Sequence, residues 1–137
     1  IDKSKSALRV AKRNIKKLKL DKQIKIKHAN FATFKSDDKF DIIVSNPPYI
    51  KYGDARVNDG AQFDPKIALY AKGDGLFAYE QIAKNAKKLL KSDGKIYLEI
   101  GIGQSNQVIK IFNFYGFKFE RVEKDLAGIN RVLVFNL

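Results

Sequence analysis

The 137-residue sequence predicts an α/β fold, a sandwich of helices on a mainly parallel sheet. Segments with apolar residues at helical spacing alternate with short runs at strand spacing, in the order α-β-β-α-β-α-β-β. An apolar content of 45% with 10 Phe is enough for the core of one ordinary domain. Ligands of such sheets bind beyond the carboxyl ends of the strands, so residues directly after a strand are the first candidates for a site.

One helix and two strands are expected before residue 46. Residues 4 to about 19 place apolar residues on one helical face and basic residues on the other, which predicts an amphipathic helix. Residues 24–28 (IKIKH) alternate as a half-buried strand, and the β-branched run within 41–45 favours a strand covered on both faces. Pro47 and Pro48 end that strand, because proline has no N–H for the ladder.

The second half of the chain predicts two helices and three strands. Residues 76–91 form a helix with one apolar face, preceded by a turn at Asp74 and ended by residues 92–94. Residues 95–100 (KIYLEI) follow as a strand, and 105–115 form a short helix that ends at Gly116. Residues 117–123 and 131–137 form two strands joined by a loop.

The amino-acid composition limits the metal sites and binding partners that we expect for this chain. The absence of cysteine excludes disulfides and thiolate metal sites, and the single histidine, His28, is more typical of a packed or edge residue than of a ligand, so no metal site is expected. The net charge of +12 attracts polyanions such as nucleic acid or the ribosome, but the lysines occur along the whole chain, which favours a solvated surface. With no membrane-length apolar run and no signal peptide, we expect a cytoplasmic protein without a membrane partner.

Five segments together resemble a known family: IDKSKSALRVAKRN, FDIIVSNPPYI, ALYAKGDGLFAYEQI, LEIGIGQ and EKDLAGINRV. In this order and at these intervals they are similar to the class I S-adenosylmethionine-dependent methyltransferases that modify a glutamine of bacterial peptide chain release factors. The Asn-Pro-Pro-Tyr tetrapeptide alone is shared with adenine-N6 DNA and RNA methyltransferases. The flanking segments favour the release factor family over these enzymes. The resemblance implies a Rossmann-like sandwich with an antiparallel C-terminal strand, and N5-methylation of the glutamine in a Gly-Gly-Gln motif.

The resemblance also implies catalytic residues in the loop after residue 45, namely Asn46, Pro47, Pro48 and Tyr49. An amide nitrogen is a poor nucleophile, because its lone pair is delocalised into the carbonyl, so the enzyme must position it. The Asn46 side-chain oxygen and the Pro47 carbonyl would accept the two N–H bonds of the substrate amide. Tyr49 would pack on the amide plane and Pro48 would keep the loop rigid. No general base is needed, because the proton becomes acidic once the nitrogen is positively charged.

S-adenosylmethionine is the cofactor that the resemblance implies, with Asp2 at the ribose hydroxyls, Asn30 and Phe31 at the adenine, and Asn46 beside them. The first two strands, the glycine-rich loop and a preceding helical domain are expected to be absent from these residues, so this chain alone is expected to be inactive. The sequence Gly101-Ile102-Gly103 suggests a circularly permuted glycine loop, but it lacks the third glycine and also fits the family's fifth strand. Two matching positions, Asp125 and Arg131, together with Glu99, are expected only to form structural pairs.

Two alternatives stay open. An adenine-N6 methyltransferase acting on nucleic acid is favoured by the basic charge, although no target-recognition segment is evident. The second alternative is a basic binding module that keeps the fold and has lost catalytic activity.

Overall fold

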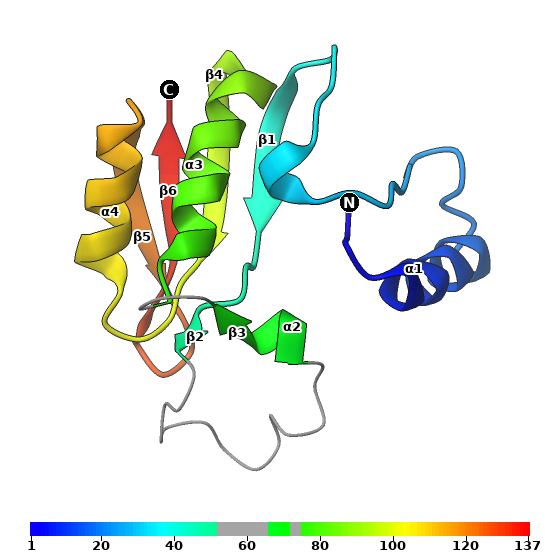
Figure 1. Cartoon of the computed structure of the whole chain (residues 1–137), viewed down its shortest axis with the longest axis horizontal. Coiled ribbons are helices and arrows are strands. Elements are labelled where there is room, and N and C mark those ends of the chain that lie inside the picture. Colours follow the sequence, from blue (N-terminus) through cyan, green and yellow to red (C-terminus); the bar gives the residue numbers. More distant parts are fainter. Residues whose placement is uncertain (52–65, 72–74) are drawn as a thin grey trace. The chain divides into compact units, whose positions relative to one another are not determined.

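The computed structural model of the chain describes residues 1–51, 66–71 and 75–137 (Figure 1). The turn expected at Asp74 lies outside these residues. The chain divides into two compact units, residues 1–35 and residues 36–137.

The first unit contains helix α1 (Lys5–Lys17) and the short 3-10 helix η1 (Phe31–Thr33). The Ser4 hydroxyl caps α1 by accepting a hydrogen bond from the Ala7 N–H at 3.2 Å. Basic residues in its last turn complement the helix dipole, and the expected helix is confirmed.

The strand expected over residues 24–28 does not form. A strand needs a ladder of hydrogen bonds to a neighbour. Within residues 1–35 the only pairing is a single parallel bridge between Asp2 and His28. The Nε2 atom of His28 lies 2.9 Å from the Lys3 carbonyl oxygen, so the histidine side chain contacts the backbone next to this bridge.

The second unit is built on a four-stranded sheet of β1 (Phe40–Ser45), β4 (Leu90–Glu99), β6 (Asn130–Asn136) and β5 (Lys118–Lys124), in that spatial order. Strands β1 and β4 are parallel, whereas β6 is antiparallel to both of its neighbours. Three strands therefore run in one direction and the C-terminal strand in the other, which confirms the predicted sheet (Figure 1). A second, parallel pair joins β2 (Ile50–Lys51) to β3 (Tyr70–Ala71), and α2 (Lys66–Leu69) precedes β3.

Helices α3 (Phe77–Leu89) and α4 (Ser105–Phe114) lie over one face of the four-stranded sheet (Figure 1). The core forms between them and that face. The ring of Phe112 on α4 stacks on Phe135 of β6, with centroids 4.5 Å apart, and contacts Phe117 at 5.2 Å. Ile96, Leu98 and Leu133 are also fully buried.

The burial of β1 differs from the expectation. Ile43 is only 8% exposed, but Ile42 is 57% and Val44 is 77% exposed. Alternate residues of a strand point to opposite faces, and the helices α3 and α4 cover only the face that Ile43 shares with Ile96. The prediction of a strand buried on both faces is therefore wrong for the described residues.

The start of β4 also differs. Helix α3 ends at Leu89 and β4 begins at Leu90, so residues 92–94 lie in the strand and do not end the helix. The register jumps there, because Phe40 pairs with Leu90 and Ile42 pairs with Lys95. At Gly94 a Cβ would lie 3.0 Å from the Phe40 carbonyl oxygen, so glycine permits this close backbone approach.

Candidate functional site

The loop Asn46–Tyr49 follows β1 at the carboxyl end of the strand, where the fold places ligands. Asn46 is exposed, and within the described residues its side chain makes no hydrogen bond. Pro47 is buried and Pro48 is half-buried. The loop lines a small hollow of about 90 Å³ together with Ile50, Ala68 and Leu69.

Tyr49 is fixed by both its hydroxyl and its carbonyl group. The hydroxyl donates to Oε1 of Glu99 at 3.1 Å, and the carbonyl oxygen accepts a hydrogen bond from Nε2 of Gln104 at 3.2 Å. Glu99 ends β4, whose Leu98 pairs with Ser45, so the parallel register brings the two strand ends together. Burial and the hydrogen bond to Glu99 raise the pKa of Tyr49, which keeps the phenol protonated as a donor.

Tyr79 of α3 contacts the same two residues, Glu99 and Gln104. Its hydroxyl, which is fully buried, lies 3.1 Å from the Glu99 carbonyl oxygen and 3.3 Å from Oε1 of Gln104. Burial is the main cause that raises the pKa of Tyr79 far above its ordinary value. The hydroxyl groups of Tyr49 and Tyr79 are therefore held neutral, and each donates a hydrogen bond.

The expected structural pair of Asp125 and Arg131 is confirmed. The Arg131 guanidinium donates to Oδ2 of Asp125 from Nη2 at 3.0 Å and from Nε at 3.2 Å, and Nη1 donates to the Ile100 carbonyl oxygen at 3.3 Å. The hydrogen bond from the Ile129 N–H is the main cause that lowers the pKa of Asp125, and the Arg131 side chain lowers it further. Glu99 also forms a structural pair, and its partner is the motif residue Tyr49.

Gly101 of the Gly101-Ile102-Gly103 segment packs closely against Gln104 and Tyr49. A Cβ at Gly101 would lie 2.8 Å from Oε1 of Gln104 and 3.0 Å from Cδ2 of Tyr49. The space beside this glycine is therefore filled by side chains of the chain itself. Sequence reasoning missed Gln104 and Tyr79, although Gln104 ends the quoted segment LEIGIGQ.

The residues expected at the cofactor include three in the first unit. Oδ1 of Asp2 accepts a hydrogen bond from the Ser4 N–H at 2.7 Å, at the start of α1. Oδ1 of Asn30 accepts one from the Ala32 N–H at 3.1 Å and so caps η1. Phe31 is half-buried. Asp2 and Asn30 thus have local structural roles, and each keeps one side-chain polar atom that forms no hydrogen bond within the described residues.

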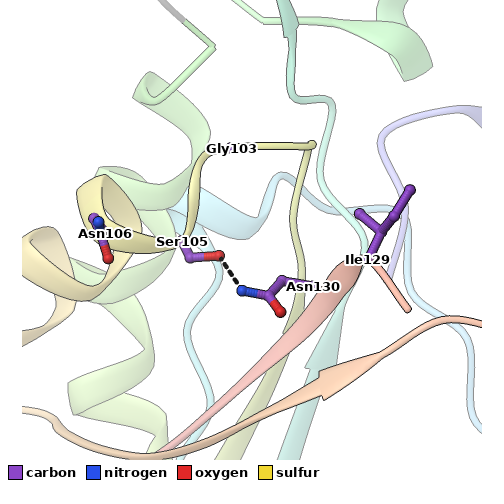
Figure 2. Close-up of a pocket in the computed structure, with 5 residues that line it drawn as sticks. All are labelled: Gly103, Ser105, Asn106, Ile129 and Asn130. Carbon is purple, nitrogen blue, oxygen red and sulfur yellow. Dashed lines mark hydrogen bonds between the residues drawn. The ribbon is translucent and has the colours of Figure 1, made fainter. Parts of the chain in front are cut away.

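A larger hollow of about 300 Å³ lies at the start of α4, lined by Gly103, Ser105, Asn106, Ile129 and Asn130 (Figure 2). The Asn130 side-chain amide donates to the Ser105 hydroxyl at 3.3 Å across it. This hollow contains no residue of the Asn-Pro-Pro-Tyr motif, and its Ser105 hydroxyl is paired with Asn130, so the Asn46–Tyr49 loop remains the candidate active site.

The excess positive charge is concentrated in the first unit. Residues 1–35 hold twelve of the 27 Lys and Arg residues but only two of the 15 Asp and Glu residues, a net charge of +10 out of +12. Lysines do occur along the whole chain, but in residues 36–137 acidic residues nearly balance them. The part of the chain that the structure describes contains no cluster of ligands for a metal ion and no helix able to cross a membrane.

The chain is similar to known methyltransferases. A family profile described as "RMKL-like, methyltransferase domain" matches residues 1–64. The chain is 44% identical over 134 residues to a "Bifunctional methyltransferase" of Rickettsia typhi, covering 96% of the chain and 26% of that protein. It is 41% identical over 126 residues to a "Release factor glutamine methyltransferase" of Clostridium botulinum, covering 89% of the chain and 44% of that protein.

A solved structure shows the fold. The ribosomal protein L11 methylase from Lactobacillus delbrueckii subsp. bulgaricus superposes with a TM-score of 0.65 over 98% of this chain and 54% of that chain, at 16% sequence identity. The predicted Rossmann-like methyltransferase fold is therefore confirmed. The chain spans about a quarter to about half the length of the curated relatives that it matches.

Proposed function

We propose a function on the premise that the chain is homologous to release factor glutamine methyltransferases, a resemblance that the comparisons confirm over most of its length. The protein uses S-adenosylmethionine to methylate N5 of a glutamine, and its substrate is the Gly-Gly-Gln motif of a peptide chain release factor. The observation that carries this proposal is the Asn46–Tyr49 loop, which is held at the end of β1 and has an exposed Asn46 side chain that forms no hydrogen bond within the described residues.

The chain's own residues position the substrate amide. The Asn46 side-chain oxygen and the Pro47 carbonyl are two acceptors at the start of the rigid Pro-Pro segment, and a primary amide offers two N–H donors to them. Acceptors for both N–H bonds hold the nitrogen in place and favour the geometry in which its lone pair leaves conjugation. The hydrogen bond from Tyr49 to Glu99 fixes the end of the loop, so little ordering is required when substrate arrives.

The residues proposed for the cofactor fit its chemistry. The second carboxylate oxygen of Asp2 can accept hydrogen bonds from ribose hydroxyls, and the side-chain NH₂ of Asn30 can donate to an adenine nitrogen. Phe31 offers an aromatic side chain for adenine packing. S-adenosylmethionine supplies an activated methyl group, and Asn46 is proposed to lie beside it.

Labelled methyl transfer tests the proposal. The protein, expressed from its complete reading frame, is offered a release factor, the same factor with its target glutamine replaced, and adenine-containing DNA and RNA. We expect label only on the intact release factor. Label on both release factors would contradict the assigned target residue.

An adenine-N6 methyltransferase is the second candidate, and the charge of residues 1–35 favours it. An adenine N6 amino group also presents two N–H donors to Asn46 and Pro47, so the loop accommodates either planar nitrogen. Label on DNA or RNA in the same experiment, with none on the release factor, would establish this function and exclude the release factor.

A further inference from the structure

Gln104 stands where the loop after β1, the end of β4 and helix α3 meet. Its Oε1 accepts hydrogen bonds from the Gly101 N–H at 2.9 Å and from the Tyr79 hydroxyl at 3.3 Å. Its Nε2 donates to the Tyr49 carbonyl oxygen at 3.2 Å. One side-chain amide therefore joins three separate segments of the chain.

Only a side-chain amide of this length satisfies these partners. A backbone N–H can only donate and a backbone carbonyl can only accept, so a single orientation of the Gln104 amide pairs with both Gly101 and Tyr49. Glutamate would have no donor for Tyr49 when ionised. Asparagine is shorter by one methylene.

Two glycines leave the room that this amide fills. A Cβ at Gly75, whose φ is +82°, would lie 2.5 Å from the Tyr49 carbonyl oxygen and 2.9 Å from Nε2 of Gln104. A Cβ at Gly101 would lie 2.8 Å from Oε1 of Gln104. Neither contact is compatible with a larger residue unless the amide or the loop moves.

Tyr49 lies three residues after Asn46, and the two prolines between them have fixed φ angles. A displacement of the Tyr49 carbonyl is therefore transmitted to the Asn46 side chain. We propose that Gln104 is a positioning residue, which holds the Tyr49 carbonyl so that Asn46 and Pro47 present their oxygens to the substrate amide. This inference rests on the proposed function.

Gln104→Glu and Gln104→Ala test this role in the complete protein, with the same substitutions at Gln107 as controls. Gln107 is exposed on α4, the helix that begins directly after Gln104. The kcat and the KM for the release factor are measured across the pH range in which the wild type is active. We expect Gln104→Glu to lower kcat about tenfold or more at pH 8, with KM nearly unchanged, because an ionised carboxylate cannot donate to the carbonyl.

The pH profile of Gln104→Glu provides the specific readout. When the introduced acid is protonated it regains an O–H donor, so the ratio of variant to wild-type kcat should rise as pH falls. The titratable groups around the junction are Glu99 on β4, Tyr49, Tyr79 on α3 and Arg131 on β6. They are present in both proteins, so a difference between the two pH profiles originates from the introduced carboxyl group and its interaction with these neighbours.

Gln104→Ala should be slow at every pH, and the Gln107 variants should retain ratios near one. A pH-independent ratio for Gln104→Glu would overturn the proposal. So would an equal loss of kcat in the Gln107 variants.

Hydrogen exchange measured by mass spectrometry tests, independently of the substrate, whether Gln104 holds the loop in place. We expect faster exchange of residues 45–51 in Gln104→Ala than in Gln107→Ala, with protection of β6 unchanged. Faster exchange throughout β6 would show a general loss of structure and overturn the specific role. If the wild type transfers no methyl group to a release factor, the proposed function fails, but the exchange result still decides whether Gln104 holds the loop.

Discussion

The hydroxyl of Tyr49 donates a hydrogen bond to Oε1 of Glu99 at 3.1 Å, and this contact joins the loop after β1 to the last residue of β4. The two residues are 50 positions apart in sequence, yet the parallel pairing of Ser45 with Leu98 brings them together. The pairing of β1 with β4 therefore supplies the residue that holds Tyr49 of the Asn-Pro-Pro-Tyr motif in place.

Tyr49→Phe should slow methyl transfer by about tenfold or more, because a hydrogen bond to a carboxylate contributes about 1.5–3 kcal/mol. The kcat for the release factor measures the effect. Tyr115→Phe, on the far end of α4, is the control and should leave kcat within about twofold of the wild type. An unchanged kcat in Tyr49→Phe would mean that the contact with Glu99 does not position the loop.

Asn46→Ala should reduce methyl transfer by about 10²-fold or more, because one acceptor for the substrate amide is removed. Its free energy of unfolding should change by less than about 0.5 kcal/mol, since the side chain is exposed and unbonded within the described residues. Transfer assays and urea unfolding measure the two effects, with Asn106→Ala as an exposed control on α4. Full activity in Asn46→Ala would exclude this loop as the active site.

Ile43→Thr should destabilise the protein by about 2 kcal/mol or more, because it removes buried apolar surface and buries a hydroxyl group. Ile42→Thr, one residue earlier, should cost no more than about 0.5 kcal/mol, because Ile42 is 57% exposed and threonine suits a strand. Urea unfolding of both variants measures the difference. Equal losses would show that the second face of β1 is covered in solution.

Stability should fall at alkaline pH through Tyr49 and Tyr79. Both native pKa values are raised, so the stabilisation is complete below the unfolded pKa of about 10 and is lost as the pH rises toward the native values. Unfolding free energies between about pH 8 and pH 11 should decline less steeply in Tyr79→Phe than in the wild type. Parallel declines in the two proteins would refute the buried neutral phenol.

Binding to polyanions should depend on the first unit. We expect a single-stranded RNA or heparin to bind weakly and to be released by salt, because the net charge of residues 1–35 is +10. Four charge reversals in α1 should abolish this binding: Lys12→Glu, Arg13→Glu, Lys16→Glu and Lys17→Glu. Four reversals in the second unit are the control: Lys84→Glu, Lys88→Glu, Lys110→Glu and Lys118→Glu.

Fluorescence anisotropy across a salt series measures the affinity of each protein. A larger loss of affinity in the control variant would contradict a polyanion surface in the first unit. Methyl transfer to RNA is scored separately, since binding alone does not make RNA a substrate.

The order and type of most elements could be predicted because they depend on local patterns. The helical spacing of apolar residues predicted α1, α3 and α4 within a few residues, and Gly116 marked the end of α4 with its φ of +89°. The two prolines ended β1 where the structure ends it. The motif and its flanking segments were enough to indicate the methyltransferase fold.

The tertiary structure alone decided which residues support the motif and which strand faces are covered. Residues 24–28 have strand periodicity, but periodicity cannot supply the neighbour that a strand requires. Ile42 and Ile43 are identical residues, and only the placement of α3 and α4 on one face separates the exposed side chain from the buried one. The partners of Tyr49 lie 50 and 55 residues away, at Glu99 and Gln104, because hydrogen bonds follow spatial distance rather than sequence order.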